Sequence, residues 1–169
     1  MTAVRNIQML MRYTAWANAR LYAALAEVPV SVLLQARPGR AGGLAGTLGH
    51  AWVVDMIWKG HLEGRPHGFT TRQPDGFPSL AELHALQDLS DQWYVGCAGS
   101  QSDDCLAEVI DFEFVDGGAG SLSRGDILLH VVNHKTYHWG YVADMLYESG
   151  LKPPTMDLPV FLRDSPPPG

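Results

Sequence analysis

The chain has 169 residues, of which 46% are hydrophobic and 18% are charged. This length fits one compact domain, and this share of apolar residues is enough for a hydrophobic core and argues against disorder. The formal net charge of −6 argues against a nucleic-acid-binding protein, because such a protein usually carries a basic face.

No apolar run reaches the roughly 18–20 residues that a membrane-spanning helix needs. The first ten residues, MTAVRNIQML, lack the basic and apolar segments of a secretion signal. We therefore expect a cytoplasmic protein that binds neither membrane nor nucleic acid. Cys97 and Cys105 form no CxxC pair and are too few for a disulfide framework, so we expect reduced thiols.

The first two predicted helices cover residues 2–27 and 44–62. In both segments apolar residues recur at steps of three and four, which is the spacing of a helix with one buried side. Pro29 follows the first segment and Pro66 the second, and proline cannot continue a helix. His50 lies on the inward stripe of the second helix.

Residues 63–78 form a connection rich in Gly and Pro. A loop this long is uncommon in a compact domain unless it has a function. Fully extended, it could span roughly 50 Å, whereas an 18-residue helix is roughly 27 Å long. It could therefore run the whole length of a bundle and allow the second and third helices to be parallel.

The third predicted helix covers residues 79–98 and begins with a capping box made by Ser79 and Glu82. Within residues 108–123, successive side chains alternate in character as they do along a short strand, and the turn signal Asp116–Gly117–Gly118 follows. Together these features indicate a small β-hairpin. A single hairpin is not stable alone, so we expect it to pack on the helices or to pair with another element.

The fourth predicted helix covers residues 124–149, between a Ser123 cap and Gly150. The remaining residues are rich in proline, but the first part of this tail also contains apolar residues that should pack on the domain. The sequence therefore predicts one domain over residues 1–164 and a flexible tail at residues 165–169.

Three of the seven histidines, His130, His134 and His138, are spaced four residues apart on the fourth predicted helix. Two histidines at this spacing can place two imidazole nitrogens on one metal ion, as HExxH helices do. His134 and His138 also fall on the apolar stripe that should face the core. A polar ring there costs on the order of a few kcal/mol without a partner, and a metal ion is one such partner.

His50 occupies an inward position of another helix, and bundles build metal sites from such positions. Two ligands from one helix and one from another would leave coordination positions open for water or substrate. Spacing alone does not decide which three histidines bind, because His130 is also one turn from His134. Hydrogen-bonded core histidines without a metal are the alternative.

Other polar residues carry weaker signals. Asp55 lies about 140° around the helix from His50, so we expect a surface or interhelix contact rather than a ligand. Tyr141 could donate a proton, orient a substrate or simply belong to the core. His61 lies about 16 Å along the helix from His50, so a surface or loop contact is expected. No GxSxG, P-loop or GxGxxG motif is present, so we leave the catalytic residues unassigned.

Several segments together resemble the DinB family. LLHVVNHKTYHWGYVADML (128–146) is similar to the last helix of that family, MRYTAWANARLYAAL (11–25) to its first helix and LAGTLGHAWVVDMIWKGHL (44–62) to its second. LKPPTMDLPVFLRD (151–164) resembles the family's ending. The resemblance thus covers nearly the whole chain, and the third predicted helix is its least distinctive part.

The resemblance implies an all-α fold, a four-helix bundle in up-down-down-up order with a long crossover between the second and third helices. It implies one divalent metal ion, usually nickel or zinc, held by His50, His134 and His138, and it implies that a homodimer is common. One departure is Trp139–Gly140–Tyr141, which stands where family members often have Arg-Gly-Gln. Substrate contacts by that Arg and Gln therefore do not carry over.

The resemblance also implies a metal-dependent enzyme. Characterised relatives are mostly S-transferases or isomerases that use a low-molecular-weight thiol, and a hydrolase acting through metal-bound water is the nearest variant. The alternative is a non-catalytic dimeric domain whose histidines bind metal for stability or sensing, or do not bind metal at all. A fourth protein ligand, for example His130, would favour the alternative, and an open pocket would favour the enzyme.

Overall fold

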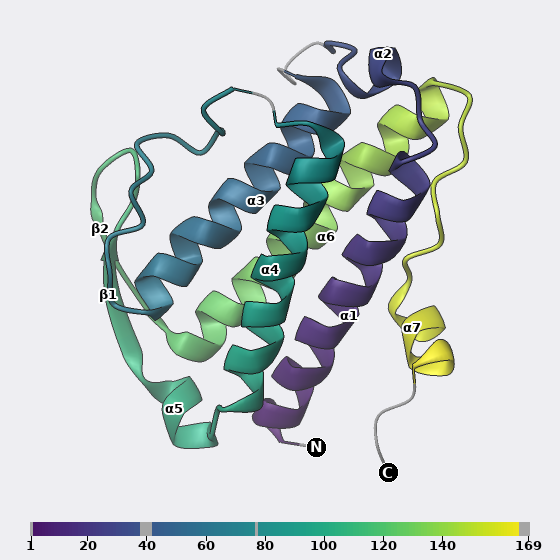
Figure 1. Ribbon diagram of the computed structural model, residues 1–169. Helices are drawn as coiled ribbons and strands as arrows, with labels where there is room; N and C mark the ends of the chain where they lie inside the picture. Colours follow the sequence, from purple (N-terminus) through teal and green to yellow (C-terminus); the bar gives the residue numbers. More distant parts are fainter. Residues whose placement is uncertain (1, 38–41, 77, 166–169) are drawn as a thin grey trace.

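A computed structural model describes residues 2–37, 42–76 and 78–165 of the chain. The four long helices, shown side by side in Figure 1, are α1 (Ala3–Leu25), α3 (Gly43–Leu62), α4 (Leu80–Gly99) and α6 (Arg124–Glu148). Short helices α2 (Val30–Leu33), α5 (Asp103–Ala107) and α7 (Leu158–Asp164) lie between and after them. Among these described residues, no helix is both long enough and apolar enough to cross a membrane.

The prediction of a mainly helical chain with one small hairpin is confirmed. Each predicted helix agrees with a long helix to within two residues at either end. The capping box is present: Ser79 accepts from the backbone N–H of Glu82, and the Glu82 side chain accepts from the backbone N–H of Ser79. The three short helices were not predicted, since four to seven residues are too few to show a helical period.

Two clusters of apolar side chains fill the space between the long helices. In one cluster Leu21 packs with Leu44 and Met145, and all three are fully buried. The other cluster contains Ile7 of α1 and Ile127 of α6, both of which are buried. Burying a side chain of this size contributes about 1.5–3 kcal/mol relative to leaving it exposed. Because α1, α3, α4 and α6 all contribute to these clusters, the core fixes how α3 and α6 face each other.

The C-terminal segment packs on the bundle, as predicted for the first part of the tail. Phe161 of α7 is buried against the rings of Tyr13 and Trp16 on α1. The Tyr13 hydroxyl also donates a hydrogen bond to the backbone carbonyl of Met156 over 2.9 Å. Of the predicted flexible tail, residues 166–169 lie outside the described residues.

The hairpin of β1 (Val109–Glu113) and β2 (Ala119–Ser123) is antiparallel and docks on α3. Phe112 is buried with its ring centroid 4.9 Å from that of Trp58 on α3. Phe112 pairs with Gly120 in the strand register, where a Cβ atom would lie 2.5 Å from the Phe112 ring. The glycine therefore leaves room for the ring that joins the hairpin to the bundle, as predicted for an element too small to be stable alone.

The connection between α3 and α4 runs beside the hairpin and back along α3 (Figure 1). Two glycines of α3 permit this close approach. A Cβ atom at Gly49 would lie 2.9 Å from the ring of Pro74, and one at Gly60 would lie 2.8 Å from Cβ of His67. The connection therefore lies directly on the helix that carries His50.

Candidate metal centre

Three imidazoles meet between α3 and α6. The ring centroid of His50 on α3 lies 5.3 Å from that of His134 and 4.8 Å from that of His138, both on α6. The ring centroids of His134 and His138 are 4.4 Å apart. One ring nitrogen from each residue lies within 4.8 Å of the other two, so the group could hold one metal ion.

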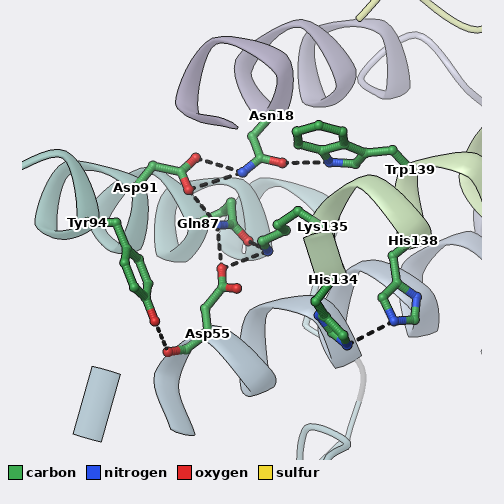
Figure 2. A network of polar contacts seen from close by, with 9 residues as sticks. All are labelled: Asn18, Asp55, Gln87, Asp91, Tyr94, His134, Lys135, His138 and Trp139. Carbon is green, nitrogen blue, oxygen red and sulfur yellow. Dashed lines mark hydrogen bonds and ion pairs between the residues drawn. The ribbon is translucent and has the colours of Figure 1, made fainter. Parts of the chain in front are cut away.

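The spacing of two of these nitrogens fits shared coordination. Nε2 of His134 and Nε2 of His138 face each other over 3.0 Å (Figure 2). Two imidazole nitrogens bound to one ion at about 2.1 Å would be about 3.0 Å apart at a right angle and about 3.4 Å apart at the tetrahedral angle typical of zinc. One turn of helix separates the two residues, which explains why a spacing of four brings both rings to one point.

His50 has a hydrogen-bond partner that sets its tautomer. Its Nδ1 lies 2.7 Å from the backbone carbonyl oxygen of Arg72 in the α3–α4 connection. A carbonyl oxygen can only accept, so this nitrogen carries the proton and Nε2 keeps its lone pair. Such an outer hydrogen bond orients a metal-binding histidine and makes it a better ligand.

Burial keeps these imidazoles neutral at pH 7. Desolvation, helped by the neighbouring histidines and by Lys135, lowers the pKa of His134 to about 3. Desolvation is also the main cause that lowers the pKa of His138 to about 4, and it lowers the pKa of His50. A histidine must be neutral to bind a metal ion, so all three are ready to bind near neutral pH.

The three histidines line a pocket of about 430 Å³. No further His, Cys, Asp or Glu belongs to the ligand group within the part of the chain that the structure describes. An ion held by three imidazoles would therefore have coordination positions open toward the pocket. The other described residues that line it are five apolar ones and four polar ones: Val54, Ile57, Trp58, Phe114, Val115, His61, Arg72, His130 and Tyr137.

The neighbouring candidates line the same pocket or its edge without joining the ligand group. The His130 ring packs edge-on against Trp58 at 5.0 Å. His61 contacts His67 of the α3–α4 connection at 5.2 Å, which agrees with the predicted loop contact. The Tyr141 ring lies 5.9 Å from that of His138, and its hydroxyl contacts that of Tyr137.

A buried polar network lies behind the histidines (Figure 2). Lys135 is 2% exposed, and its ammonium lies 2.7 Å from the Asp55 carboxylate and 2.8 Å from Oε1 of Gln87. Gln87 donates to both Asp55 and Asp91. Asp55 thus makes the interhelix contact, and the alternative of a surface position is wrong because Asp55 is 1% exposed.

The network continues through Asn18 to α1. The side-chain amide of Asn18 donates hydrogen bonds to both carboxylate oxygens of Asp91 and accepts one from the indole N–H of Trp139 over 3.0 Å. Lys135 and Trp139 each directly follow a candidate ligand on α6. By binding these two side chains, the network helps to fix the rotation of α6 that turns His134 and His138 to the pocket.

Sequence reasoning missed this network, although one signal was present. Leu128, Val132, Lys135, Trp139 and Val142 recur at steps of four and three along α6, as a core stripe does. Lys135 is the one charged residue in that run. A lysine in such a position indicates a buried ion pair, because an unpaired buried charge is too costly.

The network contains two carboxylates and one ammonium. Burial raises the pKa of Asp91 to about 6, while Lys135 and the hydrogen bond from Asn18 oppose the increase. Burial also raises the pKa of Asp55, again opposed by Lys135. The buried charges are therefore not balanced unless a proton is bound, and loss of Lys135 would leave both carboxylates without a cation.

Two comparisons with known proteins match most of this chain. The sequence model of the DinB family matches residues 2–167 of this chain, which include all four long helices and the three histidines. Protein DinB of Bacillus subtilis (strain 168) is 22% identical over 159 residues, which cover 90% of this chain and 91% of that protein.

Proposed function

This chain belongs to the DinB family, and on that basis we propose that it is a metal-dependent enzyme whose ion is held by His50, His134 and His138. One observation carries the proposal: three neutral imidazoles converge on the wall of an open pocket. Imidazole suits several divalent transition-metal ions, zinc and nickel among them. Zinc or nickel is proposed because the resemblance to the DinB family implies one of these two. The 3.0 Å between the two Nε2 atoms on α6 supports the fit.

The reaction that we propose is S-transfer or isomerisation with a low-molecular-weight thiol, and hydrolysis is the nearest variant. A divalent ion at this site would supply Lewis-acid chemistry, which lowers the pKa of a thiol or of water. Ile57, Trp58 and Phe114 give the pocket apolar walls that limit the access of bulk water.

Proton transfer in this pocket has few candidates. None of the described residues that line it has a carboxylate. Burial lowers the pKa values of His61 and His130, so each imidazole has a lone pair that can accept a proton at neutral pH. These two rings are therefore the proposed proton acceptors, and the Tyr137 hydroxyl on the same wall can contact a substrate.

The alternative is a non-catalytic domain that binds metal for stability or sensing. That function would be favoured by a fourth protein ligand that closes the site. His130 was the candidate for this role, but it packs on Trp58 and lies outside the ligand group formed by the described residues. The enzyme is therefore the function we retain.

The proposal extends to the architecture and the assembly. We propose one domain over residues 1–164 and the family's up-down-down-up bundle. The bundle order is supported by Figure 1, where α3 and α4 both begin at the end of the molecule at which α1 finishes. A homodimer is proposed from the family resemblance. The cytoplasmic location expected from the sequence is also part of the proposal.

The proposal is tested with full-length protein loaded with Co²⁺ as a spectroscopic substitute. Adding 2-mercaptoethanol at pH 7 is expected to produce a sulfur-to-cobalt charge-transfer absorption. His134→Gln is expected to lose this absorption. Turnover is then measured with zinc- and nickel-loaded protein, using the thiol with 1-chloro-2,4-dinitrobenzene for S-transfer and 4-nitrophenyl acetate for hydrolysis. Protein that binds metal but shows neither the absorption nor metal-dependent turnover would contradict the enzyme.

A further inference from the structure

The described residues that line the pocket beside the three histidines include one permanently positive side chain and no acidic one. Among the described residues that line it, Arg72 is the only one with a permanently charged side chain, although the whole chain has a net charge of −6. The histidines of the wall add no negative charge, and a divalent ion would add positive charge. The pocket therefore favours an anionic ligand.

The Arg72 guanidinium already binds a carboxylate. Its Nη2 lies 2.6 Å from Oδ1 of Asp116, in the turn between β1 and β2. Both side chains are largely exposed, at 47% and 69%. An exposed pair of this kind contributes little free energy, so another carboxylate can replace Asp116 at small cost.

The position of Arg72 is fixed even though its side chain can exchange partners. Its backbone carbonyl accepts the hydrogen bond from His50, and Pro74 lies against Gly49 of α3. The backbone from which the Arg72 side chain extends therefore stays beside the ligand group. A planar guanidinium can bind a carboxylate through two parallel hydrogen bonds, which makes it a good anchor for such a group.

The rest of the wall is apolar and suits a hydrophobic body. Val54, Ile57 and Trp58 of α3 form one part of it, and Phe114 and Val115 at the end of the hairpin form another. The volume of about 430 Å³ lies in the range of sites for small molecules. One end of a ligand can thus lie on rings and aliphatic groups while the other reaches Arg72.

We propose that the pocket accepts a small organic carboxylate with an apolar or aromatic body, and that Arg72 selects it by exchanging Asp116 for the ligand's carboxylate. This inference names the substrate class of the proposed enzyme and therefore rests on the proposed function. Arg72 is its specificity-determining residue, and the histidine group remains free for the thiol or water.

The test is calorimetric titration of zinc-loaded, full-length protein with 3-phenylpropionate and with the neutral 3-phenylpropanol. Arg72→Gln is expected to raise the Kd of 3-phenylpropionate about tenfold and to leave that of the alcohol unchanged, because a partly exposed charge-assisted pair is lost. Asp116→Asn is expected to lower the Kd of 3-phenylpropionate about two- to threefold, because the competing partner is removed.

The two substitutions break the same ion pair, so a purely structural role predicts that both shift the Kd in the same direction. Opposite directions support the inference, whereas shifts in one direction, or no effect of Arg72→Gln, would overturn it. Arg65→Gln is the matched control, because Arg65 pairs with Glu63 in the same connection and does not line the pocket. It is expected to leave both Kd values unchanged.

Failure of this inference can be distinguished from failure of the proposed function. Zinc content and the thiol-dependent cobalt absorption are measured on Arg72→Gln as well, and both are expected to match wild type. If they do and the Kd does not change, only the carboxylate inference fails. If wild-type protein holds no zinc, the proposed function fails, and the same titrations on metal-free protein still test Arg72, since its guanidinium does not depend on the ion.

Discussion

Nδ1 of His50 donates a hydrogen bond over 2.7 Å to the backbone carbonyl oxygen of Arg72. This bond joins a candidate metal ligand on α3 to the long connection that follows α3. It sets the tautomer of the imidazole, and it brings the side chain of Arg72 to the same pocket. The connection is therefore part of the site and not only a link between helices.

The first prediction concerns the contact that holds this connection on α3. Gly49→Ala would place a methyl group 2.9 Å from the ring of Pro74, so the connection must move. The His50–Arg72 hydrogen bond should weaken, and loss of such an outer partner typically lowers metal affinity about 10- to 100-fold. We expect zinc affinity, measured by competition with a chromogenic chelator, to fall by about tenfold.

Gly140→Ala is the control for this change. Gly140 is an exposed glycine within α6, and a Cβ atom there would have no neighbour within 4 Å. We expect unchanged zinc affinity and a gain in stability of about 0.5–1 kcal/mol from the higher helix propensity of alanine. Equal zinc affinity of Gly49→Ala and wild type would show that the connection does not position His50.

The second prediction separates the histidines from one another. His134→Gln, His50→Gln and His138→Gln are each expected to lower zinc affinity by at least about 100-fold, because each removes one of three ligands. His130→Gln is expected to change it by less than about tenfold, since His130 packs on Trp58 outside the ligand group. The measurement is competitive titration, and a larger effect at His130 than at His50 would mean that a different trio binds.

The third prediction concerns the buried ion pair of Lys135 and Asp55. Lys135→Met leaves two buried carboxylates without their cation and should lower the free energy of unfolding by about 3–5 kcal/mol. Adding Asp55→Leu should restore a large part of this loss, because Asp91 is then the one carboxylate left in the network, and Asn18 and Gln87 still donate hydrogen bonds to it. Urea unfolding monitored by circular dichroism measures both variants.

Arg65→Met is the control for this experiment, because it breaks an exposed ion pair with Glu63. Its effect on the free energy of unfolding should be within about 1 kcal/mol. If Lys135→Met were no more destabilising than Arg65→Met, the network would not contribute to the stability of the bundle.

These positions show how far sequence reasoning reached. The long helices and the hairpin could be predicted because their signals are local: a period of three and four residues, serine caps and the Asp116–Gly117–Gly118 turn. The approach of His50 to His134 could be predicted because both lie on inward stripes of long helices. Choosing His138 over His130 needed the family resemblance, since both are one turn from His134.

Contacts between distant segments could not be predicted. Arg72 lies 22 residues after His50 in a connection without any period, so no pattern indicated that its carbonyl would meet the imidazole. The network of Asn18, Gln87 and Asp91 likewise depends on how α1 and α4 pack. Only Lys135, a charge within an apolar stripe, gave a sign of it in the sequence.

The fourth prediction concerns the effect of pH on metal-free protein. The folded-state pKa values of about 3 for His134 and about 4 for His138 lie below the ordinary value of 6.5. The unfolded chain therefore binds protons first as the pH falls. The contribution of these histidines to stability is present above pH 6.5 and is lost as the pH falls toward 4.

Asp91 changes the stability in the opposite direction over the same pH range. Its pKa is raised from 3.8 to about 6, so its contribution is present below pH 3.8 and is lost as the pH rises through 6. Comparing wild type with a variant that lacks the two histidines therefore isolates their contribution to stability. In urea unfolding with EDTA, the double variant His134→Gln, His138→Gln should lose less stability between pH 7 and pH 5 than wild type. If wild type and the double variant lost the same amount of stability between pH 7 and pH 5, the lowered pKa values of His134 and His138 would be contradicted.

The most direct test of the account is the metal content of purified full-length protein after dialysis with zinc or nickel and removal of free ion. Mass spectrometry of the elements should find about one divalent ion per chain in wild type, and none in the triple variant with Gln at positions 50, 134 and 138. A wild-type protein that holds no stoichiometric ion, or a triple variant that holds as much as wild type, would contradict the central claim.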